Sequence, residues 1–335
     1  MRKCFLAAAI LAAFPAPVFA WGWAGHRMIG EQAAQNFPGE IPAFLRTPQA
    51  GLQIGLMAQE PDRSRASGQP HDADADPGHY VNLSDDGSIA GGPTLGGLPQ
   101  NRRDYDTALR AAGSNEYAAG FLPFNIMDGY QQLVKDFALW RMDVAALKYA
   151  KIFSMTAQER QYFARQQKVR ELLTLRDLGV WAHFVGDASQ PMHLSVHFDG
   201  WGAGPNPEGF VTAKGAHAKF ESTFVSANIH DGDVTARMRP YSPCACDIRK
   251  RTQDYLSATW ALVVPTYRLD KAGAFDTATA ESKAFAAERL AEAASQLRDM
   301  VADAWTDSGK AVLGYPKQAS VADLESGKAD PRKLD

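Results

Sequence analysis

Cysteine is scarce in this 335-residue chain, which contains only Cys4, Cys244 and Cys246. A small domain held by several disulfides and a cysteine-rich zinc site are therefore both excluded. No apolar run approaches the roughly 20 residues that a membrane-spanning helix needs, and coiled-coil heptads and short internal repeats are absent as well. The formal net charge is −3, so no basic surface predicts general binding to nucleic acid.

What the chain does contain is an ordinary globular balance, with 45% hydrophobic and 22% charged residues, enough to bury a sizeable core. At its N-terminus two basic residues precede an apolar stretch over residues 5–14, and a small residue, Ala20, follows. This order is typical of a signal peptide over residues 1–20. We expect cleavage after Ala20, a mature chain that begins at Trp21, and a secreted or periplasmic protein.

Apolar residues at helical spacing dominate the rest of the sequence, and few segments alternate as a strand does. The spacing predicts helices over residues 27–37, 126–152, 172–183, 216–225, 250–264 and 282–305. Residues 61–106 and 198–215 are rich in Gly, Pro and polar residues, which indicates long loops. We therefore expect an all-α fold: a single mainly helical domain over residues 21–316, followed by a polar, disordered tail over residues 317–335.

Histidines and carboxylates recur at a spacing that suits a metal site. His183 and Asp187 are four residues apart on one predicted helix, and His217 and Glu221 repeat the arrangement on another, so each pair shares a helix face. His193 lies between the pairs. A single pair is more typical of a cap or a surface ion pair, but two pairs joined by another histidine favour zinc, which accepts imidazole nitrogen and carboxylate oxygen.

The expected new N-terminus adds further groups that can bind a metal. A free α-amine has a pKa near 8, so it loses its proton at little cost and can then act as a ligand. Trp21 would offer this nitrogen and its carbonyl oxygen, and His26 follows five residues later. This ligand would exist only after cleavage.

Together these residues resemble a known family, the trinuclear zinc phosphodiesterases. The resemblance is carried, in order, by Trp21-Gly22-x-x-Gly25-His26, Asp62, His79, His183-Phe-Val-Gly-Asp187-x-x-Gln190-Pro191-x-His193 and His217-x-x-x-Glu221. The superfamily includes the single-strand-specific zinc nucleases of fungi, plants and bacteria, and the bacterial zinc-dependent phospholipases C. The resemblance extends over residues 21–310 and is most specific at residues 183–193.

The resemblance implies a mainly helical domain whose long loops surround a cleft with three zinc ions. The first ion is expected to bind Asp62, His79, His183 and Asp187. The second is expected to bind Trp21, through its amine and carbonyl, and His26, with Asp187 as a shared carboxylate. The third, more exposed ion is expected to bind His193, His217 and Glu221.

Such a cluster fits the cleavage of phosphate esters. Two zinc ions close together lower the pKa of a shared water toward neutrality, and a third can offset charge on phosphoryl oxygens. We expect Asp62 to orient the attacking water. The resemblance places Arg65 near the scissile phosphate, where a guanidinium suits a phosphate oxygen; a surface ion pair is the competing interpretation of Arg65.

The motifs divide between two substrate classes. The first motif and Arg65 are similar to the nucleases, whereas Glu221 resembles the phospholipases, because the nucleases usually have Asp there. We favour an endonuclease on single-stranded DNA or RNA that leaves 5′-phosphates and also removes 3′-phosphates from nucleotides. The alternatives are a phospholipase C, which would bind a phospholipid head group, and a periplasmic zinc-binding protein. We expect a monomer without stable membrane insertion.

Several conspicuous side chains are left outside this scheme. We interpret His71, His197 and His230 as surface or packing residues. We interpret Trp140, Trp181 and Trp260 as core residues. A substrate-contact role stays open for Tyr80, Phe198 and Trp201, which lie near the expected ligands in sequence. The two remaining cysteines, Cys244 and Cys246, are either bridged or free thiols.

Overall fold

The computed structural model describes residues 21–63, 65, 68, 70–202 and 204–334. The expected signal peptide, residues 1–20, lies outside the described residues. Within them the fold is one mainly helical domain with two short strands, so the predicted all-α class is confirmed. Among the described residues, no helix combines the length and the apolar character that a membrane crossing requires.

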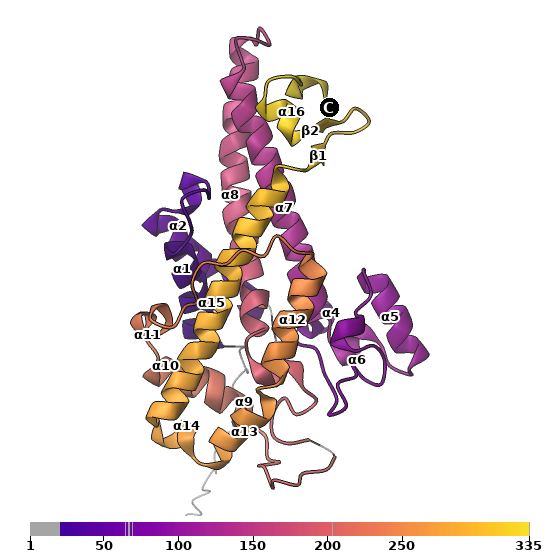
Figure 1. Ribbon diagram of the computed structural model, residues 1–335, viewed down its shortest axis with the longest axis vertical. Coiled ribbons are helices and arrows are strands. Elements are labelled where there is room, and N and C mark those ends of the chain that lie inside the picture. The colour runs from indigo at the N-terminus through magenta and orange to yellow at the C-terminus, as the bar shows by residue number, and fades with distance from the viewer. Residues whose placement is uncertain (1–20, 64, 66–67, 69, 203, 335) are drawn as a thin grey trace, which may run out of the picture.

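Three long helices organise the molecule: α7 (Leu122–Lys148), α8 (Ala157–Asp187) and α15 (Ala280–Ser308). They run along its long axis, with α7 and α8 packed against each other and α15 across them (Figure 1). The other elements, in chain order, are α1 (Gly22–Gln35), η1 (Ala43–Leu45), α2 (Pro48–Met57), α3 (Glu60–Arg63), α4 (Pro70–Ala75), η2 (Asp76–His79), η3 (Leu95–Gly97), α5 (Arg102–Ala111), α6 (Glu116–Ala119), η4 (Pro191–Leu194), α9 (Ala216–Ala218), η5 (Lys219–Phe224), α10 (Val225–Asn228), α11 (Asp231–Thr235), α12 (Ile248–Trp260), α13 (Val263–Lys271), α14 (Ala274–Thr277), β1 (Val312–Leu313), β2 (Ala319–Ser320), α16 (Val321–Glu325) and η6 (Pro331–Lys333).

The helix that extends furthest beyond its predicted bounds is α8, which begins at residue 157 rather than 172. Its start is fixed by a capping box: the Glu159 N–H donates to the Thr156 hydroxyl, and the Glu159 carboxylate accepts from the Thr156 N–H at 2.7 Å. The helix leaves Leu172 65% exposed. Strong helix formers and this cap therefore extend α8 over a stretch that apolar spacing alone does not mark.

The core lies between the long helices and α1. Phe137, Leu178, Trp181, Leu290 and Leu297 are all buried in one cluster. The core interpretation of Trp181 is thus confirmed, whereas Trp140 and Trp260 are only half-buried at its edge. Over its described residues, the predicted loop at 61–106 contains short helices, from α3 to α5.

The C-terminal segment differs from the disordered tail expected for residues 317–335. Through residue 334 it forms β2, which pairs antiparallel with β1, followed by α16 and η6, beside one end of α7 (Figure 1). Leu324 is fully buried, and Arg141 on α7 forms an ion pair with Glu325 at 2.7 Å. The composition of residues 317–335 is polar on average and indicates disorder, because it does not register these few anchoring contacts.

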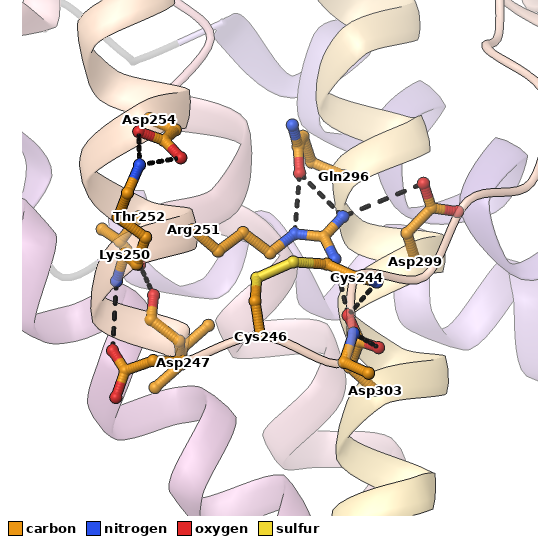
Figure 2. Close-up of a disulfide and its surroundings, with 12 residues drawn as sticks. Cys244, Cys246, Asp247, Lys250, Arg251, Thr252, Asp254, Gln296, Asp299 and Asp303 are labelled. Atoms are coloured by element: carbon orange, nitrogen blue, oxygen red, sulfur yellow. Dashed lines mark hydrogen bonds and ion pairs between the residues drawn. A yellow bond between two sulfur atoms is a disulfide. The ribbon is translucent and has the colours of Figure 1, made fainter.

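The cysteine pair left open by the sequence is a disulfide between Cys244 and Cys246. Figure 2 shows its loop resting against α15. The backbone N–H groups of Cys244 and Ala245 donate to the Asp303 carboxylate at 3.0 and 2.9 Å, and Arg251 forms an ion pair with the same carboxylate at 2.6 Å. The disulfide loop is therefore fastened to both α12 and α15, away from the histidine-rich end of α8.

Candidate metal centre

The histidines and carboxylates singled out from the sequence converge at the C-terminal end of α8. They come from the start of α1, from α3, η2, the last turn of α8, η4, and the α9–η5 segment. All of them are buried, with exposed fractions from 0% at His26, His183, Asp187 and Glu221 to 8% at His217. Segments far apart in sequence thus place their polar side chains at one internal point.

Local structure explains how α8 supplies two of these side chains and η4 a third. His183 and Asp187 share one face of the last turn because they are four residues apart. The helix then ends, and the Gln190 side chain accepts the Met192 N–H at 2.7 Å before the η4 turn at Pro191. This turn brings His193 back toward the same point.

The first group consists of Asp62, His79 and His183, whose ligand atoms lie within 4.8 Å of one another. His79 Nδ1 is 2.9 Å from His183 Nε2, and each nitrogen is within 3.9 Å of Asp62 Oδ1. Asp187 Oδ2 adds a fourth atom, 3.1 Å from His79 Nδ1 and 3.2 Å from His183 Nε2. The four residues expected to bind the first ion are therefore brought together.

The second group consists of His26, His183 and Asp187, so it shares His183 with the first group. His26 stacks on His183 with ring centroids 3.8 Å apart, and its Nε2 is 3.5 Å from Asp187 Oδ1. Gly186 permits this approach, because a Cβ there would lie only 3.0 Å from His26 Nδ1. The two carboxylate oxygens of Asp187 thus face different groups, as a bridging carboxylate requires.

The third group consists of His193, His217 and Glu221. His217 Nε2 is 2.8 Å from Glu221 Oε2 and 3.1 Å from His193 Nε2. Glu221 lies in a π-helical turn, Lys219–Phe224, of a kind that is frequent at functional sites. The two predicted helix pairs therefore both form, although the second stands on a short α–π–α segment rather than on one regular helix.

Trp21 occupies a position that differs from its expected partnership with His26. Its backbone N–H donates to Glu221 Oε2 at 3.1 Å, so this nitrogen adjoins the third group. The indole N–H donates to the Gly186 carbonyl at 2.8 Å and to Ser189 Oγ at 3.1 Å, which anchors the fully buried ring beneath the end of α8. Trp21 therefore ties the start of the described chain to the centre.

Backbone carbonyls fix how three of the histidines present their rings. The Nδ1 atoms of His183, His193 and His217 lie 2.8, 2.6 and 2.7 Å from the carbonyl oxygens of Ala58, His79 and Phe198. A carbonyl only accepts, so each Nδ1 carries a proton and each ring turns its Nε2 atom inward. Outer hydrogen bonds of this kind orient metal-binding histidines.

The resulting arrangement calls for a cation. The Nε2 lone pairs of His193 and His217 face each other at 3.1 Å, which is repulsive unless a proton or a metal ion lies between them. Five buried atoms here have no hydrogen-bond partner: His26 Nδ1, His26 Nε2, Asp62 Oδ2, Asp187 Oδ1 and Glu221 Oε1. Unpartnered polar atoms are rare and costly in folded proteins, so the donor set fits bound metal.

The ionisation states also suit metal binding. Although burial opposes it, the nearby histidines hold the pKa of Asp187 well below its usual value and that of Glu221 at about 2. Burial lowers the pKa of His79 to about 4 and also lowers that of His26, against the pull of Asp187. At neutral pH both carboxylates are therefore charged and these two histidines neutral, the forms in which they bind zinc.

A cavity of about 230 Å³ opens beside the first and third groups. Its walls include Arg65, Tyr80, Asn82, Phe198 and Asp199 in addition to His79, Met192, His193 and His217. Arg65 forms ion pairs with Asp62 at 3.3 Å and Asp76 at 2.9 Å. The ion-pair interpretation of Arg65 is thus seen directly, and the same pairs hold its guanidinium at the cavity wall.

Of the other side chains considered from the sequence, His71 and His230 are exposed, in agreement with their structural interpretation, and His197 is buried at 1% exposure. Trp201 is 6% exposed and belongs to a small core cluster, whereas Phe198 is 50% exposed at the cavity. Sequence reasoning quoted Gln190 in the motif but gave it no role; its side-chain N–H donates to Glu221 Oε2 at 3.0 Å. Its position between Asp187 and His193, two expected ligands, was the sequence signal that could have indicated a role in the centre.

Comparison with known proteins gives little beyond fold class. No protein-family model matches the chain, and no curated protein matches its sequence. Alpha toxin from Clostridium absonum aligns with a TM-score of 0.40 and 13% identity over 85% of this chain and 64% of its own length. Alpha-toxin from an avian strain of Clostridium perfringens aligns with a TM-score of 0.37 and 13% identity, over 87% and 67%. These similarities are too low to bear on activity.

Proposed function

We propose that this chain is a zinc-dependent hydrolase of phosphodiester bonds. The observation that carries the proposal is the convergence of three buried histidine–carboxylate groups, two of which border one cavity whose wall holds an arginine. Three divalent cations would bring six positive charges, and Asp62, Asp187 and Glu221 would return three negative ones. The centre would then be a positive pocket in a chain of formal net charge −3, which suits an anionic phosphodiester.

The residues that would hold the ions follow from the three groups. They are Asp62, His79, His183 and Asp187; His26 with Asp187; and His193, His217 and Glu221. The resemblance adds the amine and carbonyl of Trp21 to the second set, whereas its nitrogen here lies beside Glu221 of the third. Bound zinc supplies Lewis-acid chemistry, which acidifies water and offsets charge on phosphate oxygens. The imidazole and carboxylate donors, with no thiolate among them, suit zinc.

The chain's own residues divide the remaining work. Asp62 is the residue that would orient the attacking water, because its Oδ2 is buried and has no hydrogen-bond partner. Arg65 lies beside it and would bind a phosphate oxygen, exchanging its pairs with Asp62 and Asp76 for the substrate. Tyr80 and Phe198 would form the cavity wall against the group attached to the phosphate, and help to exclude water.

Single-stranded nucleic acid is the substrate that we favour. An unpaired strand can bring an exposed phosphodiester to a recessed centre, and its bases can stack on the aromatic side chains of the cavity. We propose an endonuclease that leaves 5′-phosphates and also removes 3′-phosphates from nucleotides. The protein would act as a monomer, secreted or periplasmic, after cleavage following Ala20 frees the Trp21 amine.

A phospholipase C is the second candidate. It is favoured by Glu221 in the third group. The nucleases that this chain resembles usually have Asp at that position. The cavity beside that group would then receive a phospholipid head group. Since either activity would use the same residues to hold the ions, only the substrate separates the two.

The decisive experiment uses the mature chain beginning at Trp21, purified with zinc. It is incubated in parallel with single-stranded DNA, single-stranded RNA and phosphatidylcholine vesicles, each with and without chelator. We expect chelator-sensitive release of 5′-mononucleotides. Release of diacylglycerol with intact nucleic acid would transfer the protein to the second candidate. A zinc-loaded chain that cleaves none of the three would leave a zinc-binding protein without this activity.

A further inference from the structure

His217 is held by one dipeptide of the loop that follows η4. The Asp199 Oδ1 atom accepts the backbone N–H groups of Gly215 at 2.7 Å and of His217 at 3.2 Å. The neighbouring carbonyl of Phe198 accepts the His217 Nδ1–H at 2.7 Å. Both the main chain and the ring of His217 are thus oriented from residues 198 and 199, neither of which is a candidate ligand.

This arrangement matters because His217 lies in the first turn, Ala216–Ala218, of an α–π–α segment that ends at Asn228. So short a helical segment is marginally stable by itself. It is preceded by Gly215 with a φ of +116°. The first group, by contrast, draws His183 and Asp187 from the 31-residue α8. The third group therefore depends on outside contacts to keep His217 in place.

The dipeptide is in turn anchored by His197. The His197 Nδ1 atom accepts the Gly202 N–H at 3.0 Å, so the proton is on Nε2, which donates to Asp85 at 2.9 Å. The ring stacks on Trp201 with centroids 3.8 Å apart and an angle of 11°. The Tyr267 hydroxyl donates to the His197 carbonyl at 2.7 Å. A residue interpreted from the sequence as packing thus ties this loop to α13 and to the segment around residue 85.

The loop is closed tightly on its far side as well. Gly200 has a φ of +90°, and a Cβ there would lie 2.6 Å from the Ala213 carbonyl oxygen. The Trp201 N–H donates to the Val211 carbonyl at 2.7 Å. The two ends of the glycine-rich stretch from residue 198 to 215 are therefore clamped together just where Asp199 reaches Gly215.

We propose that Asp199 is a positioning residue for the third metal group, and that the stack of His197 on Trp201 holds it in place. The inference rests on the proposed function, because it assumes that His193, His217 and Glu221 hold an ion. Asp199 itself touches no metal: it fixes the backbone from which His217 projects. Loss of its carboxylate acceptor should release His217 and lower the affinity of this group alone.

The test compares Asp199→Ala with Asp199→Asn, whose side-chain oxygen can still accept both N–H groups. The matched control is Asp247→Ala, because Asp247 caps α12 by accepting the Lys250 N–H at 3.1 Å, away from the candidate ligands. We measure zinc per chain after dialysis, zinc affinity by competition with a chromophoric chelator, and the visible spectrum of the cobalt-substituted protein. Thermal unfolding confirms that each variant is folded.

We expect Asp199→Ala to bind one ion fewer per chain, with affinity at that site reduced about 10- to 100-fold, and to change part of the cobalt spectrum. Asp199→Asn should restore the wild-type values, and Asp247→Ala should keep them. If Asp199→Ala does not fold, Trp201→Leu, which removes only the stack on His197, should lower the same affinity by a smaller factor.

The outcomes separate this inference from the proposed function. A folded Asp199→Ala protein with full zinc content and affinity would overturn the positioning role while leaving the hydrolase proposal intact. An unchanged third site in Trp201→Leu would do the same where Asp199→Ala is unfolded. If the wild-type chain binds no zinc, both the function and the inference built on it are wrong.

Discussion

Two clusters of buried and half-buried polar side chains lie along the α7–α8 pair, and they differ in how their polar atoms are paired. The carboxylate cluster, halfway along the helices, contains Asp136, Asp143 and Asp177 with Gln132 and Arg170. Its Arg170 forms an ion pair with Asp136 at 2.9 Å, and the Gln132 amide donates to Asp136 and Asp177 at 3.2 and 3.0 Å. None of its polar atoms is among the buried atoms without a hydrogen-bond partner.

The metal centre at the end of α8 is the opposite case. Five of its buried atoms have no hydrogen-bond partner, and two imidazole lone pairs face each other. Of the three carboxylates in the centre, only Asp62 forms an ion pair with Arg65, whose guanidinium lies at the cavity wall. A buried cluster that contains its own cation and donors is structural, whereas one that lacks them is built for a ligand from outside. The predictions below test this distinction.

The largest expected effect is that of Asp187→Asn. Asp187 adjoins His26, His79, His183 and His193 at 3.1 to 3.6 Å, so its negative charge serves two metal groups at once. We expect two ions to be lost together and hydrolysis to fall by more than about 100-fold, beyond the range of an outer-shell change. Zinc analysis and single-strand cleavage measure the two effects.

The matched control is Asp177→Asn, the same substitution on the same helix but in the carboxylate cluster. It should leave zinc content and cleavage unchanged, because Asp177 faces Gln132 rather than the centre. Loss of a single ion from Asp187→Asn would contradict the shared role of its carboxylate. Equal losses in the two variants would remove the distinction between the clusters.

Removal of the metal comes next in size. A chelator should lower the melting temperature of the wild-type chain, because ions that bind only the folded state stabilise it by about 4 kcal/mol at a thousandfold excess over Kd. The shift should be lost in the Asp187→Asn, Glu221→Gln double variant and retained in Asp177→Asn. Calorimetry with and without added zinc measures it. A chelator-independent melting temperature in the wild type would argue against bound metal.

Glu221→Gln should have a smaller and more local effect. Glu221 belongs to the third group only, and its Oε2 also accepts the Trp21 and Gln190 N–H groups. We expect the loss of one ion, with the other two retained, and a fall in cleavage of about 10- to 100-fold. Metal content, compared with that of Asp187→Asn, checks whether the third site is independent. Loss of all three ions would show that the groups form one cooperative unit.

The sequence predicted which side chains would converge better than it predicted the scaffold that presents them. The predicted proximity of His183 and Asp187 is found in the structure, because residues four apart on a helix lie on the same face. It does not predict that His217 and Glu221 stand on a π-helical turn, or that the Phe198 carbonyl and Asp199 orient His217 from a loop. These are long-range contacts, and they depend on packing that no local pattern contains. The ordered tail was missed for the same reason, since its evidence is the burial of Leu324.

The effect on metal binding and cleavage is expected to be smallest in the carboxylate cluster, where the effect on stability has the opposite sign. Burial, opposed by Arg170, raises the pKa of Asp143 to about 7, from an ordinary value of 3.8. Between these values the folded chain holds a proton that the unfolded chain has lost. The free energy of unfolding therefore falls as pH rises from about 4 to about 7. Asp143→Asn removes this titration and keeps a neutral side chain of similar shape.

We accordingly expect Asp143→Asn and the wild type to be equally stable near pH 4, and the variant to be more stable by about 4 kcal/mol at pH 8. Urea unfolding across that range measures the difference, with the exposed Asp104→Asn as control and with zinc content unchanged in both. A constant difference at every pH would mean that Asp143 does not titrate in the folded chain. A loss of zinc would mean that the two clusters are coupled along α8, and that the boundary between structural and ligand-binding charge lies elsewhere.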